Sequence, residues 1–260
     1  MRAVETLIVV LTMLLLVTTA SGWAYTYSMN QSKAGEITYA INVMLQMAEG
    51  VDGIVNHRGG SSTLQFEFRY GALVSADEQQ FSLSTVISGV SYNLPPAGSP
   101  VYKTRRLHYF IPFSMYPSIP ILDRGTENKT SEPYIASSIQ TDEPNLVFHY
   151  SSIGRTYVAY YRQPLVSIVR TSGKVSIHVT FLTFRQVALK AGTAAFVLES
   201  DDISSFYMVL ASATPTVSVV LTQGANPIQV NVGNQLPPGD FLGQGDILEV
   251  YAHQLTVTVR

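Results

Sequence analysis

The first 36 residues read MRAVETLIVVLTMLLLVTTASGWAYTYSMNQSKAGE, and no residue between Glu5 and Lys33 carries a formal charge. A stretch of this kind can cross a bilayer core of about 30 Å, which needs roughly 20 residues at about 1.5 Å each. Its most apolar part, here called the apolar run, holds ten large apolar side chains: Leu7, Ile8, Val9, Val10, Leu11, Met13, Leu14, Leu15, Leu16 and Val17. The sequence therefore predicts an apolar N-terminal helix that can insert into a membrane.

Three interpretations of this segment compete. It could be a secretory signal peptide cleaved near the small residues 19–22, a permanent single-span anchor, or a helix that is first stored in the membrane and later packed into a fibre. Arg2 lies on the side expected to stay cytoplasmic, and the outer end carries the aromatic group Trp23, Tyr25 and Tyr27. Because Glu5 offsets the charge of Arg2, the basic n-region of a signal peptide is missing, and we expect the segment to be retained.

Glu5 beside the apolar run is costly in lipid, by roughly 2.5–3.5 kcal/mol at the bilayer centre, so it needs a partner. With Met1 as a hydrophobic first residue, Glu5 at the fifth position and an unbroken apolar helix after it, the segment resembles the mature N-terminus of the type IV pilin superfamily. The resemblance implies that Glu5 pairs with the N-terminal amine of Met1 in a neighbouring subunit and that the apolar run forms the filament core.

The basic Arg2 makes the start of the chain resemble archaeal class III signal sequences as well, where cleavage follows a basic residue. Cleavage after Arg2 would make Ala3 the first mature residue and would remove the pairing role of Glu5. A simpler alternative for Glu5 is an ordinary first-turn glutamate, which the helix dipole favours. The resemblance covers about the first 30 to 50 residues.

The helix is expected to continue beyond the apolar run. One apolar stripe follows the i, i+3, i+4, i+7 spacing of a helix face: Ile37, Ala40, Ile41, Met44 and Ala48. Gly50 and Gly53 are typical of a helix end. We therefore predict a helical segment over 1–50, about 70 Å long for 48 residues. Two helices broken at Gly22 or near Asn30 are the alternative.

From about Ser61 onward the pattern changes to alternation with period two. About ten strands are expected: 64–70, 81–92, 106–112, 146–150, 157–161, 175–181, 206–211, 216–222, 247–252 and 255–259. The predicted fold class is α+β, with a long hydrophobic helix followed by a mainly antiparallel β-sandwich over 54–260. Two small β-domains are the alternative, because 114–145 is a long excursion containing Pro and Thr.

The composition argues against several functional classes. Charged residues make up 13% of the chain and the net charge is −2, so no broad basic surface is available for nucleic acid. There is no cysteine, and hence no disulfide or thiolate chemistry. The five histidines are scattered, and neither an HExxH nor a GxSxG motif occurs. We expect no enzyme activity, no cofactor and no metal site.

The sequence thus favours a structural subunit that polymerises with copies of itself into an extracellular filament for adhesion or cell–cell contact, after insertion in the cytoplasmic membrane. Asn30 and Asn128 begin the two N-glycosylation sequons, so N-linked glycans are further expected partners. The alternative function is a membrane-anchored extracellular β-sandwich protein, for instance a stator-like component of an archaeal swimming filament. A third class is a secreted hydrolase or sugar-binding module whose signal peptide is included in the sequence.

Overall fold

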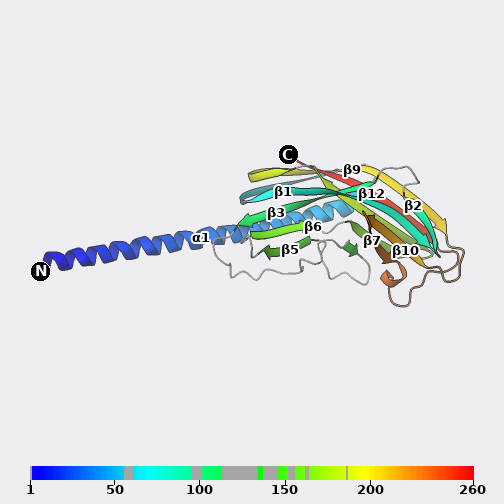
Figure 1. Cartoon of the computed structure of the whole chain (residues 1–260), viewed down its shortest axis with the longest axis horizontal. Coiled ribbons are helices and arrows are strands. Elements are labelled where there is room, and N and C mark those ends of the chain that lie inside the picture. The colour runs from blue at the N-terminus through cyan, green and yellow to red at the C-terminus, as the bar shows by residue number, and fades with distance from the viewer. Residues whose placement is uncertain are drawn as a thin grey trace.

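A computed structural model describes residues 2–55, 61–94, 101–112, 134–136, 146–151, 156–161, 164–185 and 187–260. The predicted α+β class is confirmed: one long N-terminal helix, α1, precedes a body made of strands (Figure 1). The first half of α1 projects away from this body, while its second half lies against the strands. We call the strand-rich part from residue 61 onward the sheet domain.

Helix α1 (Arg2–Val55) is a single helix of 54 residues, about 80 Å long. It runs through Gly22 and Asn30 without a break, so the two-helix alternative is wrong. Polar side chains along it do not interrupt the helix, because their hydroxyls donate to carbonyls one turn earlier. Thr18 Oγ1, for example, lies 2.9 Å from the carbonyl oxygen of Leu14. The helix also passes the predicted end at residue 50 and stops at Val55.

The strands form one twelve-stranded sheet. Their bounds, together with the short 3-10 helix η2, are β1 (Ser61–Ile87), β2 (Val90–Leu94), β3 (Tyr102–Pro112), β4 (Tyr134–Ala136), β5 (Leu146–Ser151), β6 (Thr156–Tyr161), β7 (Leu165–Thr171), β8 (Lys174–Phe184), β9 (Ala188–Val209), β10 (Val217–Gln223), β11 (Asn226–Asn231), η2 (Gly233–Gln235) and β12 (Ile247–Val259). Two predicted strands, 247–252 and 255–259, are parts of the single strand β12. The predicted strand 81–92 is divided by a turn at Ser88 and Gly89, both with positive φ.

The predicted antiparallel sandwich is wrong in two respects. First, β1 pairs with β9, β9 with β12, β12 with β8, β8 with β3, and β3 with β1, so these five strands close into a barrel-like ring. Second, the sheet is mixed, because β12 runs parallel to β8 and antiparallel to β9. The cause is topological. The last strand inserts between two strands that run in opposite directions, so it must be parallel to one of them.

The position of β12 also settles where the C-terminal strand pairs. Residues 247–257 pair with β8 on one side, and residues 247–259 pair with β9 on the other. Both edges of the C-terminal strand are therefore occupied within its own chain, and this strand has no free edge to offer to a neighbour.

Two apolar cores hold the molecule together. The first joins α1 to the ring and includes Ile37, Ala40, Val43, Met44, Met47, Phe66, Phe68, Tyr109, Phe196, Leu255 and Val257. The second contains no residue of α1 and includes Phe81, Leu83, Val166, Ile177, Phe181, Val219, Leu221 and Val250. Phe181 and its neighbour Leu182 belong to different cores, so β8 is buried on both faces at this point.

The predicted helical stripe is confirmed where its side chains are described. Ile37, Ala40 and Met44 are buried in the first core, and Ile41 packs against its rim. The second half of α1 is therefore an integral part of the sheet domain's core, while the first half has no such contact.

Candidate functional site: the N-terminal helix and its attachment

The apolar run lies on the projecting part of α1 (Figure 1). Its ten large apolar side chains are between 52% and 67% exposed, on all sides of the helix. The helix is long and apolar enough to cross a membrane. An apolar surface of this extent requires an apolar environment, either lipid or other protein chains.

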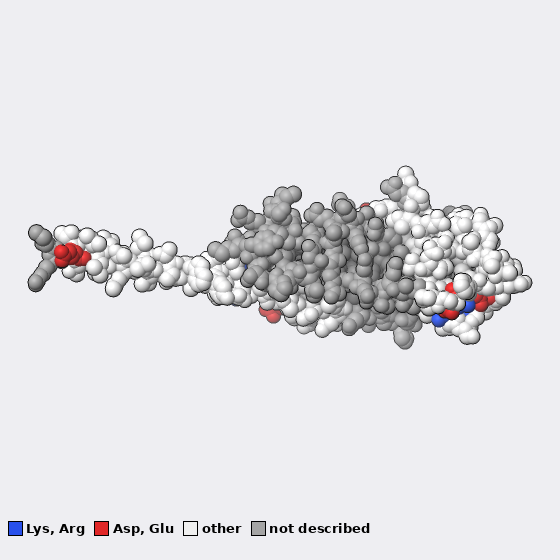
Figure 2. Space-filling view, turned by 90° about the horizontal axis from the view of Figure 1, so that it is seen from below, with Lys and Arg blue, Asp and Glu red and all other residues white. Residues whose placement is uncertain are grey.

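Beyond Glu5, the projecting segment carries no formal charge. Figure 2 shows acidic atoms at its N-terminal end and uncharged side chains from there to the sheet domain. Glu5 lies exposed in the first turn of α1. The other member of the predicted pair, Met1, lies outside the described residues, so the pairing with its amine stays a prediction.

Between the apolar run and the sheet domain lies a neck, residues 18–32, with aromatic side chains on its surface. Trp23 and Tyr27 are one turn apart, and their rings stack with centroids 5.5 Å apart and an angle of 16° between the planes. Gln31 Nε2 donates to Tyr27 Oη at 3.2 Å. The three side chains form one row along the helix, here called the neck row. Asn30, the first glycosylation candidate, lies half-buried beside it, and Asn128 lies outside the described residues.

Where α1 enters the sheet domain, Glu36 fixes it to strand β1. The Glu36 carboxylate accepts from the backbone N–H groups of Arg69 at 2.8 Å, Tyr70 at 2.9 Å and Gly71 at 2.8 Å. It also accepts the phenol proton of Tyr109 on β3, at an O–O distance of 2.6 Å. These amides lie where the pairing of β1 with β9 shifts register, so they have no place in the regular ladder. The carboxylate replaces their missing strand partners.

The surroundings of Tyr109 make this contact rigid. Its ring is completely buried in the first core, and burial together with the hydrogen bond to Glu36 raises the pKa of its phenol well above the ordinary value. Gly71 lies against the hydroxyl end of this ring. A β-carbon at position 71 would be 2.3 Å from Cε2 of Tyr109, so only glycine fits there. One helical turn before Glu36, the buried Lys33 donates through Nζ to the carbonyl oxygen of Pro112 at 2.8 Å.

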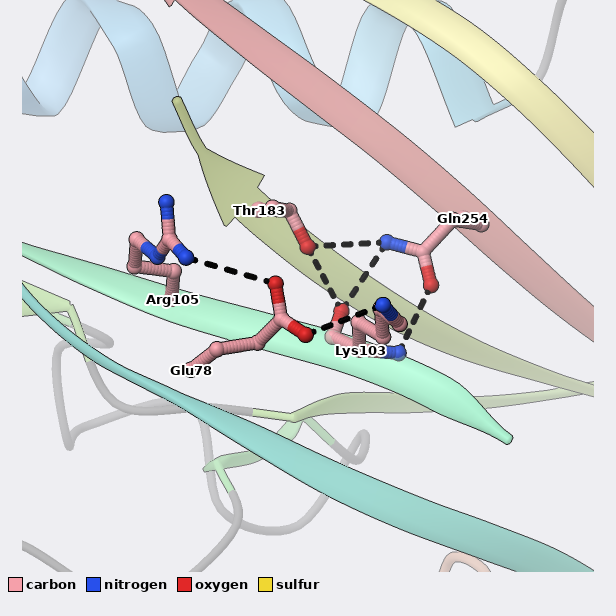
Figure 3. A network of polar contacts seen from close by, with 5 residues as sticks. All are labelled: Glu78, Lys103, Arg105, Thr183 and Gln254. Atoms are coloured by element: carbon pink, nitrogen blue, oxygen red, sulfur yellow. Dashed lines mark hydrogen bonds and ion pairs between the residues drawn. The ribbon is translucent and has the colours of Figure 1, made fainter. Parts of the chain in front are cut away.

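A second polar network closes the ring between β3 and β8 (Figure 3). These strands share a single backbone pairing, Arg105 with Thr183. Beside it, Gln254 of β12 accepts from the backbone N–H of Lys103 and donates to its carbonyl oxygen, both at 2.9 Å. The side-chain amide thus makes the two bonds that a peptide group would make in a ladder. Glu78 pairs with Lys103 at 3.0 Å and with Arg105 at 3.4 Å. The network completes a sheet, and each of its five side chains has a partner within it.

Two histidines on adjacent strands also have shifted pKa values. His178 Nδ1 and His253 Nε2 are 3.1 Å apart, with ring planes at 14°. Tyr251 stacks on His178 with centroids 4.9 Å apart, and Glu249 accepts from Tyr251 Oη at 2.6 Å and pairs with Lys174 at 2.8 Å. The two nitrogens face each other at hydrogen-bond distance, which leaves no room for a metal ion between them. Among the described residues, no group of three or more His, Cys, Asp or Glu side chains could hold a metal.

The histidine pair should make the folded chain less stable in acid. Burial, and to a lesser extent the proximity of His178, lowers the pKa of His253 to about 4, while burial lowers the pKa of His178 as well. An unfolded histidine takes up its proton near pH 6.5, whereas folded His253 resists protonation until about pH 4. The stabilisation is therefore present above pH 6.5 and is lost as the pH falls toward 4.

We expect His253 to account for a loss of about 2 kcal/mol of unfolding free energy between pH 7 and pH 4, after a discount for solvent screening. Urea unfolding at both pH values measures the loss, and His253→Asn should remove most of the difference. The same substitution at His108, which is outside the pair, is the control. An unchanged pH dependence in His253→Asn would show that other groups cause the acid sensitivity.

Comparisons with models of known protein families, with characterised proteins and with solved structures give no match to this chain. The features that bear on function are therefore the helix, its exposure and its attachment to the sheet domain.

Proposed function

We propose that this chain is the structural subunit of an extracellular filament, a pilin-like protein that polymerises through its N-terminal helix. The observation that carries the proposal is the division of α1 into two halves with opposite environments. Its second half supplies the first core of the sheet domain, whereas the apolar run is exposed on every side. The second half of the helix is thus already packed within its own chain, whereas the apolar run needs lipid or other chains to cover it.

Burial of the apolar run would supply the driving force. Its ten large apolar side chains contribute roughly 15–30 kcal/mol gross when fully removed from water, from which association entropy and side-chain ordering subtract. Neighbouring copies present the same surface, so each subunit can repeat the contact with several others. The bonds of Glu36 and Lys33 hold α1 at a fixed height and angle in the sheet domain. A regular arrangement of the helices in the filament core would therefore impose a regular arrangement on the sheet domains around it.

Membrane and surface partners follow from the same arrangement. Before assembly, the lipid bilayer would cover the apolar run, and the aromatic neck would lie at the outer interface. After assembly, the sheet domain would face outward as the adhesive surface, with N-linked glycans at Asn30 and Asn128. We propose no catalytic role and no cofactor.

A second candidate is a membrane-anchored extracellular protein that does not polymerise, such as a stator-like component of an archaeal swimming filament. The length of α1 and the position of its aromatic residues after the apolar run favour this alternative. In that case the apolar run would contact lipid for the life of the protein. The two functions differ in what happens when lipid and detergent are removed.

Electron microscopy of the purified full-length chain after detergent removal tests the proposal. We expect ordered fibres from the wild-type chain and none from a Leu11→Asp/Leu15→Asp variant, because each buried carboxylate is costly in an apolar core. The matched control, Val209→Asp, changes an exposed valine of the sheet domain and should still form fibres. Wild-type chains that remain solitary in liposomes, with no fibres at any concentration, would overturn the proposal in favour of the anchored alternative.

The role of Glu5 can be tested separately. Glu5→Ala is expected to slow polymerisation strongly or abolish it, because the carboxylate would otherwise pair with the N-terminal amine of a neighbour and set the axial register. Circular dichroism should show an unchanged sheet domain. Glu67→Ala, which changes an exposed glutamate on β1, is the control for loss of a negative charge. Fibres of normal rate and appearance from Glu5→Ala would refute the pairing role while leaving the role of the apolar run intact.

A further inference from the structure

The side chains of the neck row already contact one another in the single chain, before any partner binds. Trp23 is 65% exposed and Tyr27 is 55% exposed, yet their rings stack on each other, and Gln31 holds the Tyr27 oxygen from the next turn. Side chains at i and i+4 share one helix face, so the three form a continuous strip. Stacked, hydrogen-bonded side chains lose little freedom when a partner arrives, and Trp and Tyr are the residues that interfaces favour.

The position of the row on α1 indicates what could cover it. The neck continues directly from the apolar run, so chains aligned along that run bring their necks into the same assembly. Helices in contact lie about 8–10 Å apart, whereas the sheet domain is much wider than the helix in both views (Figures 1 and 2). Displacement of the copies along the axis removes the collision between sheet domains. It also places the sheet domain of one copy beside the neck of another.

The chemistry of the row fits a weakly charged protein surface. Thr6 to Ser32 contains no formal charge, so no ion pair is needed. Because the Tyr27 oxygen accepts from Gln31, its own O–H remains a donor for an acceptor on the partner. The sheet domain offers many such acceptors, because it has many hydroxyl and amide side chains. Only 13% of the residues of the chain are charged, so its surface is weakly charged as well.

We infer that the neck row Trp23–Tyr27–Gln31 is a second self-association site, which receives the sheet domain of an axially displaced copy of the same chain. This inference rests on the proposed function. It assigns the row a role distinct from that of the apolar run: the run supplies the drive to assemble, and the row selects the displacement at which neighbouring copies stop.

The chain carries its own reporter for this contact, since Trp23 is its only tryptophan. On fibre formation we expect Trp23 emission to move to shorter wavelength and its quenching by acrylamide to fall several-fold. The Trp23→Ser/Tyr27→Ser variant should need about a tenfold higher concentration to form ordered fibres, as for loss of an aromatic interface anchor. Tyr25→Ser is the matched control. Tyr25 is 70% exposed but two residues from Trp23 and so outside the row.

The outcomes separate this inference from the proposed function. Fibres in which Trp23 stays as accessible to acrylamide as in the dispersed chain would overturn the inference and leave the filament function standing. Equal effects of Trp23→Ser/Tyr27→Ser and Tyr25→Ser on assembly would overturn it as well. Absence of fibres from the wild-type chain would instead contradict the proposed function itself. All three substituted side chains are exposed, and circular dichroism of each variant confirms that the sheet domain is folded.

Discussion

Glu36→Ala is expected to lower the unfolding free energy of the sheet domain by about 4–6 kcal/mol, at roughly 1–1.5 kcal/mol for each of the four hydrogen bonds that its carboxylate accepts. The loss is large because alanine leaves the N–H groups of Arg69, Tyr70 and Gly71 and the hydroxyl of Tyr109 without their acceptor. Tyr109 is completely buried, so water cannot easily take the place of the carboxylate there. Urea unfolding followed by circular dichroism measures the change.

Two further variants make this measurement specific. Glu67→Ala removes an exposed glutamate from the outer side of β1 and should change the unfolding free energy by no more than about 0.5 kcal/mol. Glu36→Gln keeps one acceptor oxygen of the same shape, so its loss should be intermediate. If Glu36→Ala proved as mild as Glu67→Ala, the attachment of α1 would depend on apolar packing alone.

The dependence of the sheet domain on α1 has a consequence for assembly. The first core combines side chains from one face of α1 with side chains of β1, β3, β8, β9 and β12. The helix is therefore part of the fold that positions the outer surface. A filament held together by the apolar runs would impose its geometry on every sheet domain, because no flexible linker separates the two halves of α1.

Helix α1 was predictable because its signals are local. The absence of charge between Glu5 and Lys33 identifies the apolar segment, and the spacing of Ile37, Ala40 and Met44 identifies the face that packs on the sheet. The helix end was placed too early. Gly50 and Gly53 are typical of helix ends, but the helix continues through both to Val55, so glycine alone was too weak a signal here.

For the strands too, features set by the local sequence were predictable, and features set by distant partners were not. Period-two alternation identified the buried positions Phe66 and Phe68 on β1 and Ile177 and Val179 on β8. Most of β9 was missed: only 206–211 was expected to be a strand in this region, whereas β9 is a strand of 22 residues. Closure of the ring and the parallel pairing of β12 depend on partners far along the chain, which alternation does not specify.

The attachment site was missed altogether, although one signal for it exists. Glu36 stands directly before Ile37 in the stripe that packs on the sheet, where a carboxylate requires a partner. That partner is a set of backbone amides 33 to 35 residues later, and their identity is set by the register shift in β1. Side-chain types alone do not reveal such a site. The role of Gln254 as a substitute peptide group was hidden for the same reason.

Gly71→Ala is expected to destabilise the sheet domain by about 3 kcal/mol, at the upper end of the range for overpacked cores. Its new β-carbon would lie 2.3 Å from Cε2 and 2.4 Å from Cζ and Oη of Tyr109. The ring has little room to move aside, because it is completely buried and its hydroxyl is bonded to Glu36. The cause is steric, so the same substitution at a glycine with open space around it should behave differently.

Gly35→Ala provides that comparison. Apart from the helix's own backbone and the adjacent residues, no atom lies within 4 Å of a β-carbon at this position, so alanine should be neutral or should stabilise the helix by up to about 1 kcal/mol. In a double-mutant cycle, Tyr109→Leu should cost less in the Gly71→Ala background than in the wild-type chain, because it removes the atoms that collide. Strictly additive losses would contradict the close approach of Gly71 and Tyr109. A coupling of the expected sign would show that this glycine is required where β1 passes over the ring that Glu36 holds.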